Sequence, residues 1–122
     1  MASTYAQRKA LGDYGEQLAA DLLLAEGMQV LERNYRCPVG EIDIVALDGA
    51  TLVICEVKTR RDLGHGTPLE AVTVAKARRL RALAGHWLSE HDLRVGGVRI
   101  DVVAVVVPPR GRTRLERVQG VS

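Results

Sequence analysis

Two apolar segments joined by Asp48-Gly49 predict a β-hairpin near the middle of the chain. Residues 41–47 and 50–58 are rich in Ile, Val and Leu, and Asp-Gly tolerates the positive φ angles that a two-residue primed turn requires. Four charged residues interrupt these segments where apolar residues are expected: Glu41, Asp43, Glu56 and Lys58. Ionised carboxylates are costly to bury unless they are paired, hydrogen-bonded or bound to metal. The pattern therefore predicts a divalent-cation site on the hairpin.

The register of this hairpin decides which charged side chains share a face. If Leu47 faces Ala50 across a two-residue turn, alternation puts four side chains on one side of the sheet: Glu41, Asp43, Glu56 and Lys58. Asp43 and Glu56 are then diagonal neighbours with Cα atoms roughly 7–8 Å apart, a span that two carboxylates can close onto one cation. Glu41 faces Glu56, which calls for a cation, a lysine or an altered protonation state. The alternative is that Glu41 turns outward at the start of the strand.

Helical periodicity and helix-capping residues predict two helices. Apolar residues at helical spacing predict a helix over residues 11–26, which Gly27 ends in a left-handed conformation. The segment Thr67-Pro68-Leu69-Glu70 combines a capping-box threonine, a first-turn proline and a reciprocal glutamate. A second helix is therefore expected from this segment to about residue 90.

Two further strands are expected outside the hairpin. Residues 28–36 form the first, and residues 98–107 form the last, which Pro108-Pro109 ends. The continuous apolar run in the last strand indicates that both of its faces are covered. The basic tail, residues 110–122, either adds an edge strand or is disordered.

One charged residue in each predicted helix falls on the apolar face. A helical wheel points Glu16 toward protein. A lone glutamate of this kind more often makes only a local hydrogen bond, but the nearby hairpin acids favour a place for Glu16 in the same site. Lys76 falls between Thr73 and Leu80, where it either extends to solvent along its alkyl stem or reaches the carboxylates or a bound phosphate.

Size and composition bound the fold and the partners. With 122 residues, of which 47% are hydrophobic, the chain fits a single domain with one core. Aromatic residues make up 3% of the sequence and phenylalanine is absent, so contacts with nucleic acid are expected to be electrostatic rather than built on base stacking. Basic residues gather after the acidic segments and in the tail, which suits a phosphate backbone and equally suits a solvated surface.

Cysteine and histidine usage argues against a zinc site and a disulfide framework. Cys37 and Cys55 are too few and too poorly spaced for either, and the three histidines lack metal-ligand spacing. The N-terminus carries no signal-peptide-like apolar run, and no segment reaches the roughly 18 apolar residues that a membrane span needs. A cytoplasmic location without a membrane partner is therefore expected.

The order of the charged motifs resembles that of the PD-(D/E)xK nuclease superfamily. A helical glutamate, a strand aspartate and a Glu-x-Lys motif follow one another there, as do Glu16, Asp43, Glu56 and Lys58 here. This order is similar to that of archaeal Holliday-junction resolvases. A closer resemblance, over nearly the whole chain, is to the small bacterial YraN family. It rests on Gly15-Glu16, Asn34-Tyr35-Arg36, Gly40-Glu41-Ile42-Asp43, Glu56-Val57-Lys58-Thr59-Arg60, Lys76 and Arg99-Ile100-Asp101-Val102. Gly40-Glu41-Ile42 stands where the superfamily's proline would precede the aspartate.

These resemblances imply an α/β, restriction-endonuclease-like fold with a central mixed β-sheet flanked by helices. They imply that Asp43, Glu56 and the backbone carbonyl of Val57 bind Mg²⁺ or Mn²⁺, with Glu16 and Glu41 as further candidate ligands. Lys58 would orient or help to activate the attacking water, a role that suits an ammonium beside a cation. The residues expected to contact nucleic acid are Thr59, Arg60, Arg61, Lys76, Arg78, Arg79 and Arg81. The resolvase resemblance also implies a homodimer.

Three functions are compatible with these features. The first is a metal-dependent endonuclease that hydrolyses phosphodiester bonds in DNA, at branched or otherwise structured sites, with RNA left open as a substrate. The second is a non-catalytic nucleic-acid-binding protein on a nuclease-like scaffold. The third is a structural protein in which Glu56, Lys58 and Lys76 form a buried ionic network.

Overall fold

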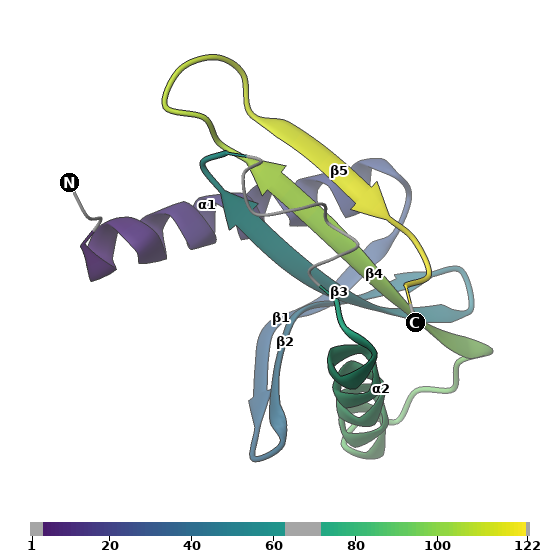
Figure 1. Ribbon diagram of the computed structural model, residues 1–122. Helices are drawn as coiled ribbons and strands as arrows, with labels where there is room; N and C mark the ends of the chain where they lie inside the picture. Colours follow the sequence, from purple (N-terminus) through teal and green to yellow (C-terminus); the bar gives the residue numbers. More distant parts are fainter. Residues whose placement is uncertain (1–3, 63–71, 122) are drawn as a thin grey trace.

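A computed structural model describes residues 4–62 and 72–121 and has an α/β architecture, with a mixed β-sheet covered by a helix on each face (Figure 1). The elements in chain order are α1 (Tyr5–Ala25), β1 (Gln29–Cys37), β2 (Gly40–Asp48), β3 (Thr51–Arg60), α2 (Val74–Ser89), β4 (Gly97–Val106) and β5 (Arg114–Val118). The five strands lie in the order β1-β2-β3-β4-β5. Only β3 and β4 are parallel, because α2 lies in the connection between them, whereas the other neighbours are antiparallel.

Helix α1 begins at Tyr5, so the predicted start at residue 11 is wrong. The Thr4 side chain accepts a hydrogen bond from the N–H of Gln7, and the Gln7 side chain accepts one from the N–H of Thr4. This capping box satisfies N–H groups that no preceding turn can reach. The first turns of α1 are exposed and carry no apolar stripe, which is why periodicity does not reveal them. The predicted end is confirmed, with Gly27 at a φ of +88°.

Two apolar cores lie on opposite faces of the sheet. The α1-side core contains Ala19, Ala20, Leu23, Ile44, Val53, Cys55 and Val103. The α2-side core contains Ile42, Val45, Leu52, Ile54, Leu80, Leu83, Trp87, Ile100 and Val102. Strands β3 and β4 supply both cores, which confirms that the last strand is covered on both faces. Each large apolar side chain buried here contributes about 1.5–3 kcal/mol.

The β2–β3 hairpin has a register two residues away from the predicted one. Leu47 pairs with Leu52 rather than Ala50, and the turn is Gly49-Ala50 rather than Asp48-Gly49. Gly49 has a φ of +60° at the first central position, where a type II′ turn places its glycine. A shift of two residues leaves unchanged which side chains share a face. The corrected register, continued beyond its last pair, brings Asp43 opposite Glu56 instead of diagonal to it.

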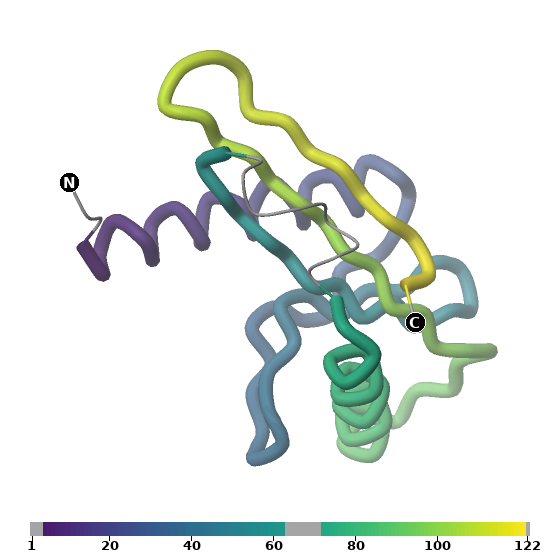
Figure 2. Tube along the Cα trace, in the orientation of Figure 1, coloured from purple at the N-terminus to yellow at the C-terminus, as the bar shows by residue number. Residues whose placement is uncertain are grey.

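Strands β2 and β3 separate beyond the pair Ile44–Cys55, and we call this point the fork. The β1–β2 hairpin bends here. Ile44 packs in the α1-side core whereas Ile42 packs in the α2-side core, although simple alternation would put both on one face. Asn34 in β1 has a φ of +54°, a left-handed conformation that asparagine tolerates better than most residues. Figure 2 shows the end of this hairpin turned toward α2, which contacts β2.

The C-terminal half completes the sheet. Helix α2 begins at Val74 with Thr73 as its N-cap. The predicted helix includes residues 72 and 73, and that part of the prediction is wrong. The predicted capping segment, residues 67–70, lies outside the described residues. The predicted end of α2 is confirmed at Ser89, and β4 agrees with the expected strand to within one residue. The basic tail contributes the edge strand β5, antiparallel to β4.

No helix in the described ranges 4–62 and 72–121 is long and apolar enough to cross a membrane.

Candidate functional site

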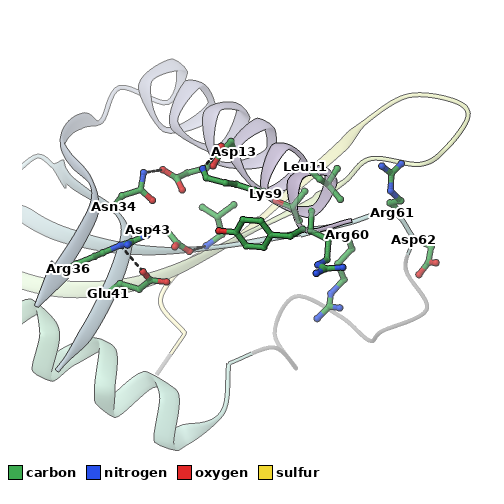
Figure 3. A pocket seen from close by; sticks show the side chains of 16 residues that line it. Lys9, Leu11, Asp13, Asn34, Arg36, Glu41, Asp43, Arg60, Arg61 and Asp62 are labelled. Atoms are coloured by element: carbon green, nitrogen blue, oxygen red, sulfur yellow. Dashed lines mark hydrogen bonds and ion pairs between the residues drawn. The ribbon is translucent and has the colours of Figure 1, made fainter. Parts of the chain in front are cut away.

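The fork places the candidate residues between two hollows, one on each face of the sheet. The α1 hollow, of about 660 Å³, lies between the N-terminal half of α1 and the ends of β1, β2 and β3 (Figure 3). The α2 hollow, of about 220 Å³, lies between α2 and the fork. Glu41 and Asp43 line both hollows, because the bend of β2 brings them between the two faces. Asp43 therefore occupies the position that connects the site on one face with the site on the other.

Asp43 lies on the separating strand and contacts β3 through its side chain. Its Oδ2 accepts a hydrogen bond from the N–H of Val57 at 2.8 Å. Burial raises the pKa of Asp43 to about 6, and the negative charges of Glu56, Glu16 and Glu41 act in the same direction, whereas the hydrogen bond from Val57 opposes them. The predicted acids are thus close enough to interact electrostatically, with Asp43 at the centre of the interaction.

Glu56 is 9% exposed and pairs with two lysines on the α2 side of the sheet. Its Oε1 lies 2.9 Å from the Nζ of Lys76 and 3.7 Å from the Nζ of Lys58. Lys76 is expected either to extend to solvent or to reach the carboxylates or a phosphate, and in the structure it reaches the carboxylate of Glu56. Partial burial, followed by the nearby Lys76 ammonium, lowers the pKa of Lys58. Lys58 is thus the looser partner of Glu56, and Lys76 is the tighter one.

Glu16 lies on the α1 side and is 8% exposed, so the prediction that it points toward protein is confirmed. Its Oε1 accepts hydrogen bonds from Nδ2 of Asn34 at 2.9 Å and from Nε of Arg33 at 3.2 Å. Gly15 allows this approach of α1 to the sheet, because a Cβ there would lie 1.9 Å from Oγ1 of Thr59. The glycine before Glu16 thus fixes how closely the glutamate approaches the fork.

Glu41 is more exposed than the other candidate ligands. Its carboxylate lies 3.3 Å from Nε of Arg36, and both side chains are largely exposed. The expectation that Glu41 faces Glu56 is wrong, because the corrected register and the bend of β2 move Glu41 away. The alternative of an outward-turned Glu41 describes the structure.

The residues predicted to contact nucleic acid divide between the hollows. Thr59, Arg60 and Arg61 line the α1 hollow at the C-terminal end of β3. Lys76 and Arg79 line the α2 hollow. The remaining two, Arg78 and Arg81, line neither hollow, and Arg81 instead donates to the carbonyl of Val98 at 3.4 Å.

The donor set is compatible with a hard cation held mainly by two acids. Within residues 4–62 and 72–121, no three Asp, Glu, His or Cys side chains converge so as to hold a metal ion by themselves. Mg²⁺, however, is usually held by one or two carboxylates together with waters and substrate phosphates. Asp43 and Glu56 both line the α2 hollow and meet this requirement. Val57, whose carbonyl is the third predicted ligand, lines the α1 hollow.

Three residues near the site are absent from the predicted set. Arg33 and Asn34 hold Glu16, and Tyr5 lines the α1 hollow from the first turn of α1. Two features of the sequence could have pointed to Asn34: its place in the Asn-Tyr-Arg motif and the tolerance of asparagine for a left-handed backbone. The signal for Tyr5 is the Thr4 to Gln7 capping box, which extends the helix toward the N-terminus.

Comparisons with known proteins match most of the chain. The family described as "Uncharacterised protein family UPF0102" matches residues 15–105, a range that includes Glu16, Asp43, Glu56 and Lys58. A UPF0102 protein of Streptomyces griseus is 59% identical over 116 residues, covering 94% of this chain and 98% of the relative. A UPF0102 protein of Beutenbergia cavernae is 55% identical over 115 residues, with the same two coverages. The chain therefore belongs to the UPF0102 family.

Proposed function

We propose that this chain is a Mg²⁺- or Mn²⁺-dependent endonuclease with a restriction-endonuclease-like fold, which hydrolyses phosphodiester bonds in DNA. One observation carries the proposal: Asp43 and Glu56, on separating strands, line one hollow, and the negative charge of Glu56 contributes to raising the pKa of Asp43 to about 6. Two carboxylates held this close destabilise each other unless a cation or a proton lies between them. A divalent cation relieves that repulsion and gives the pair a function.

The side chains at the fork have distinct roles in this proposal. Asp43 and Glu56, with the carbonyl of Val57, would hold the cation. When bound, the cation would supply Lewis-acid stabilisation of the charge that develops on the phosphoryl oxygens. Lys76 keeps Glu56 paired at 2.9 Å, so Lys58, at 3.7 Å, is the lysine that can turn toward a water or phosphate. Glu16, held by Arg33 and Asn34, would position a water from the α1 side.

The fold supports this proposal in one further respect. A mixed sheet with a helix on each face is what the nuclease resemblance implies, and the acids lie where two of its strands separate. Such a fork exposes backbone and side-chain oxygens that an unbroken ladder would cover. Fold alone does not establish an activity, so the proposal depends on the acids at the fork. Branched or structured DNA as substrate, a homodimer and a cytoplasmic location stay predictions.

A cleavage assay tests the proposal. Purified protein is incubated with end-labelled single-stranded, duplex, forked and four-way DNA, and with matching RNA, in Mg²⁺, Mn²⁺ or EDTA. We expect cleavage only with a divalent cation. Asp43→Asn and Glu56→Gln should lower the rate by about 100-fold or more, because they remove cation ligands, and Lys58→Ala should lower it by a similar factor.

The matched control is Asp21→Asn, an exposed acid on α1 that lines neither hollow. It should cleave at the rate of the wild type. Circular dichroism on each variant shows whether a loss of cleavage comes from the missing side chain or from unfolding of the protein. Cleavage that persists undiminished in Asp43→Asn and Glu56→Gln would refute the assigned site.

A non-catalytic protein is the second candidate, and the pairing of Glu56 favours it. Two lysines already neutralise this carboxylate, as a structural ionic network would require. In that case the protein binds DNA, or serves only as a structural element, without any dependence on divalent cations. DNA binding without cleavage, together with a melting temperature that no divalent cation changes, would support this candidate over the endonuclease.

A further inference from the structure

Tyr5 is the most exposed large apolar residue among those described, at 74%, and it lines the α1 hollow. A single exposed aromatic residue needs no explanation by itself. Tyr14, on the same helix, is 49% exposed and lines neither hollow, so its exposure alone does not point to a binding site. Tyr5 differs because it lines a space bounded by charged groups, where an aromatic ring can stack on a base.

Two arginines, Arg60 and Arg61, line one end of the α1 hollow beside Asp62. Arg60 and Arg61 lie at the C-terminal end of β3, across the hollow from Arg36 and Glu41 (Figure 3). In the part of the chain that the structure describes, neither Arg60 nor Arg61 forms an ion pair with a carboxylate. Both guanidinium groups therefore remain able to bind phosphates.

Two of the acids that line the hollow, Asp43 and Glu16, are less exposed than Arg61, whereas the other three acids are exposed: Asp13, Glu41 and Asp62. Asp43 and Glu16 are buried or half-buried and line the hollow at the fork, whereas Arg61 is exposed. A phosphodiester chain can therefore contact the arginines directly, but a phosphate approaches the acids favourably only with a cation. A strand bound in this arrangement would place its stacked base and phosphate contacts near Tyr5 and the arginines, and its scissile bond toward the fork.

The size of the hollow is compatible with unpaired nucleic acid. A cube of the hollow's 660 Å³ has a side of about 9 Å, less than the ~12 Å width of the major groove alone of B-DNA. The hollow is nevertheless in the range of roughly 300–1,000 Å³ that is typical of ligand pockets. An unpaired stretch of one strand is compatible with this volume.

We infer that the α1 hollow binds an unpaired stretch of DNA, with one base stacked on Tyr5 and the adjacent phosphates held by Arg60 and Arg61. This inference rests on the proposed nuclease function and names its substrate: DNA with a single-stranded segment, such as a fork or an overhang. It also changes the expectation from composition, because one well-placed tyrosine supplies stacking in a chain that has few aromatic residues.

Binding without cleavage tests the inference. Fluorescence anisotropy in EDTA is measured with a short labelled single-stranded oligonucleotide, with RNA of the same sequence and with a blunt duplex. Tyr5→Ala should weaken binding of the single strand about tenfold, as expected for the loss of one stacked base, and should leave duplex binding unchanged. Tyr5→Phe, which retains a ring, and Tyr14→Ala, the matched control, should bind like the wild type. Equal loss with RNA would widen the substrate class to both nucleic acids.

Salt dependence tests the two arginines. For a single strand, each phosphate contact adds about 0.7 to the slope of log K against log salt. The double variant Arg60→Ala/Arg61→Ala should therefore lower the magnitude of the slope by about 1.4. The control Arg94→Ala, in an exposed arginine that lines neither hollow, should leave it unchanged.

The outcomes separate this inference from the proposed function. Single-strand affinity that is unchanged in Tyr5→Ala, while cleavage still depends on Asp43, would overturn the inference and leave the nuclease intact. A tenfold loss in Tyr5→Ala without cleavage under any divalent cation would support strand binding and overturn the nuclease. Equal losses for single strand and duplex would also overturn the inference, because Tyr5 would then not distinguish unpaired DNA.

Discussion

Oδ2 of Asp43 accepts a hydrogen bond from the N–H of Val57 at 2.8 Å, across the fork where β2 leaves β3. The side chain thus takes the place of a backbone carbonyl that β2 would have supplied if the ladder had continued. This contact satisfies an N–H that the separation of the strands would otherwise leave unpaired. It also ties one oxygen of the carboxylate to the sheet, which fixes the orientation of the other oxygen relative to Glu56.

The raised pKa of Asp43 predicts a loss of stability as pH rises. The folded protein holds this proton up to about pH 6, whereas the unfolded chain releases it near 3.8. The free energy of unfolding should therefore fall by at most about 3 kcal/mol between these two pH values, because each pKa unit corresponds to about 1.4 kcal/mol. Asp43→Asn, which stays neutral and keeps an acceptor for Val57, should be more stable than the wild type above pH 6 and equally stable near pH 4.

Urea denaturation in EDTA across this pH range measures the difference between variant and wild type. Titrating groups that do not interact with Asp43 contribute equally to both proteins and cancel. Asp21→Asn, on the exposed face of α1, should show a difference from the wild type that does not change with pH. If the difference for Asp43→Asn were also independent of pH, the pKa of Asp43 would not be raised in the folded protein.

A divalent cation should reverse this destabilisation. Ligands that bind only the folded state stabilise it by about 2.7 kcal/mol at a hundredfold excess over Kd, and each kcal/mol raises the Tm of a domain of this size by roughly 4 °C or more. We expect Mn²⁺ to raise the Tm of the wild type by about 10 °C at that excess, and to have almost no effect on Asp43→Asn or Glu56→Gln.

The quantity to compare is the cation-dependent shift within each variant, since Glu56→Gln also removes the partner of Lys76 and lowers the Tm by itself. Thermal unfolding followed by circular dichroism, with Ca²⁺ and EDTA as further conditions, gives this shift. An equal Mn²⁺ shift in all variants would place the cation elsewhere.

The contact between Gly15 and Thr59 predicts that α1 cannot accept a side chain at residue 15. A Cβ there would lie 1.9 Å from Oγ1 and 2.8 Å from Cβ of Thr59. Gly15→Ala should therefore destabilise the protein by about 1–3 kcal/mol, because α1 must move away from β3. Gly12→Ala is the matched control on the same helix, where a Cβ meets nothing within 4 Å. It should stabilise by up to about 1 kcal/mol.

Chemical denaturation of both variants measures these effects. The double variant Gly15→Ala/Thr59→Ala should recover part of the loss, because it removes Oγ1 and Cγ2 of Thr59 and leaves only its Cβ in the way. If Gly15→Ala were as stable as Gly12→Ala, the close packing of α1 on β3 would be wrong.

Strand positions could be predicted from the sequence because apolar runs end at glycine, proline or charged residues. The register of the β2–β3 hairpin could not, since turns at Asp48-Gly49 and at Gly49-Ala50 give the same alternation of faces. Burial of complete cross-strand pairs such as Leu47 with Leu52 decides between them, and that depends on α2 as well as on the hairpin itself.

The residues that gather at the fork could be named from the sequence as a candidate site, but their division between two faces could not. Strict alternation puts Ile42 and Ile44 on one side of a strand, and the bend at Asn34 and Asp43 places them on opposite sides. The place of Tyr5 in the α1 hollow could not be predicted either, because a composition with few aromatic residues says nothing of where a ring lies.

The buried carboxylate of Asp101 predicts a large structural effect far from the hollows. Asp101 is 0% exposed and accepts hydrogen bonds from Arg99, from Arg117 and from the N–H of Gly120, so it ties β4 to β5 and to the segment after it. Asp101→Asn removes the charge that the two arginines share and should destabilise the protein by about 3–5 kcal/mol.

Glu116→Gln, an exposed acid on β5, should change stability by no more than about 0.5 kcal/mol. Urea denaturation measures both. Because Arg99 also pairs with Asp48 and Arg117 with Glu26, a small effect of Asp101→Asn would mean that these outer acids hold the arginines without it.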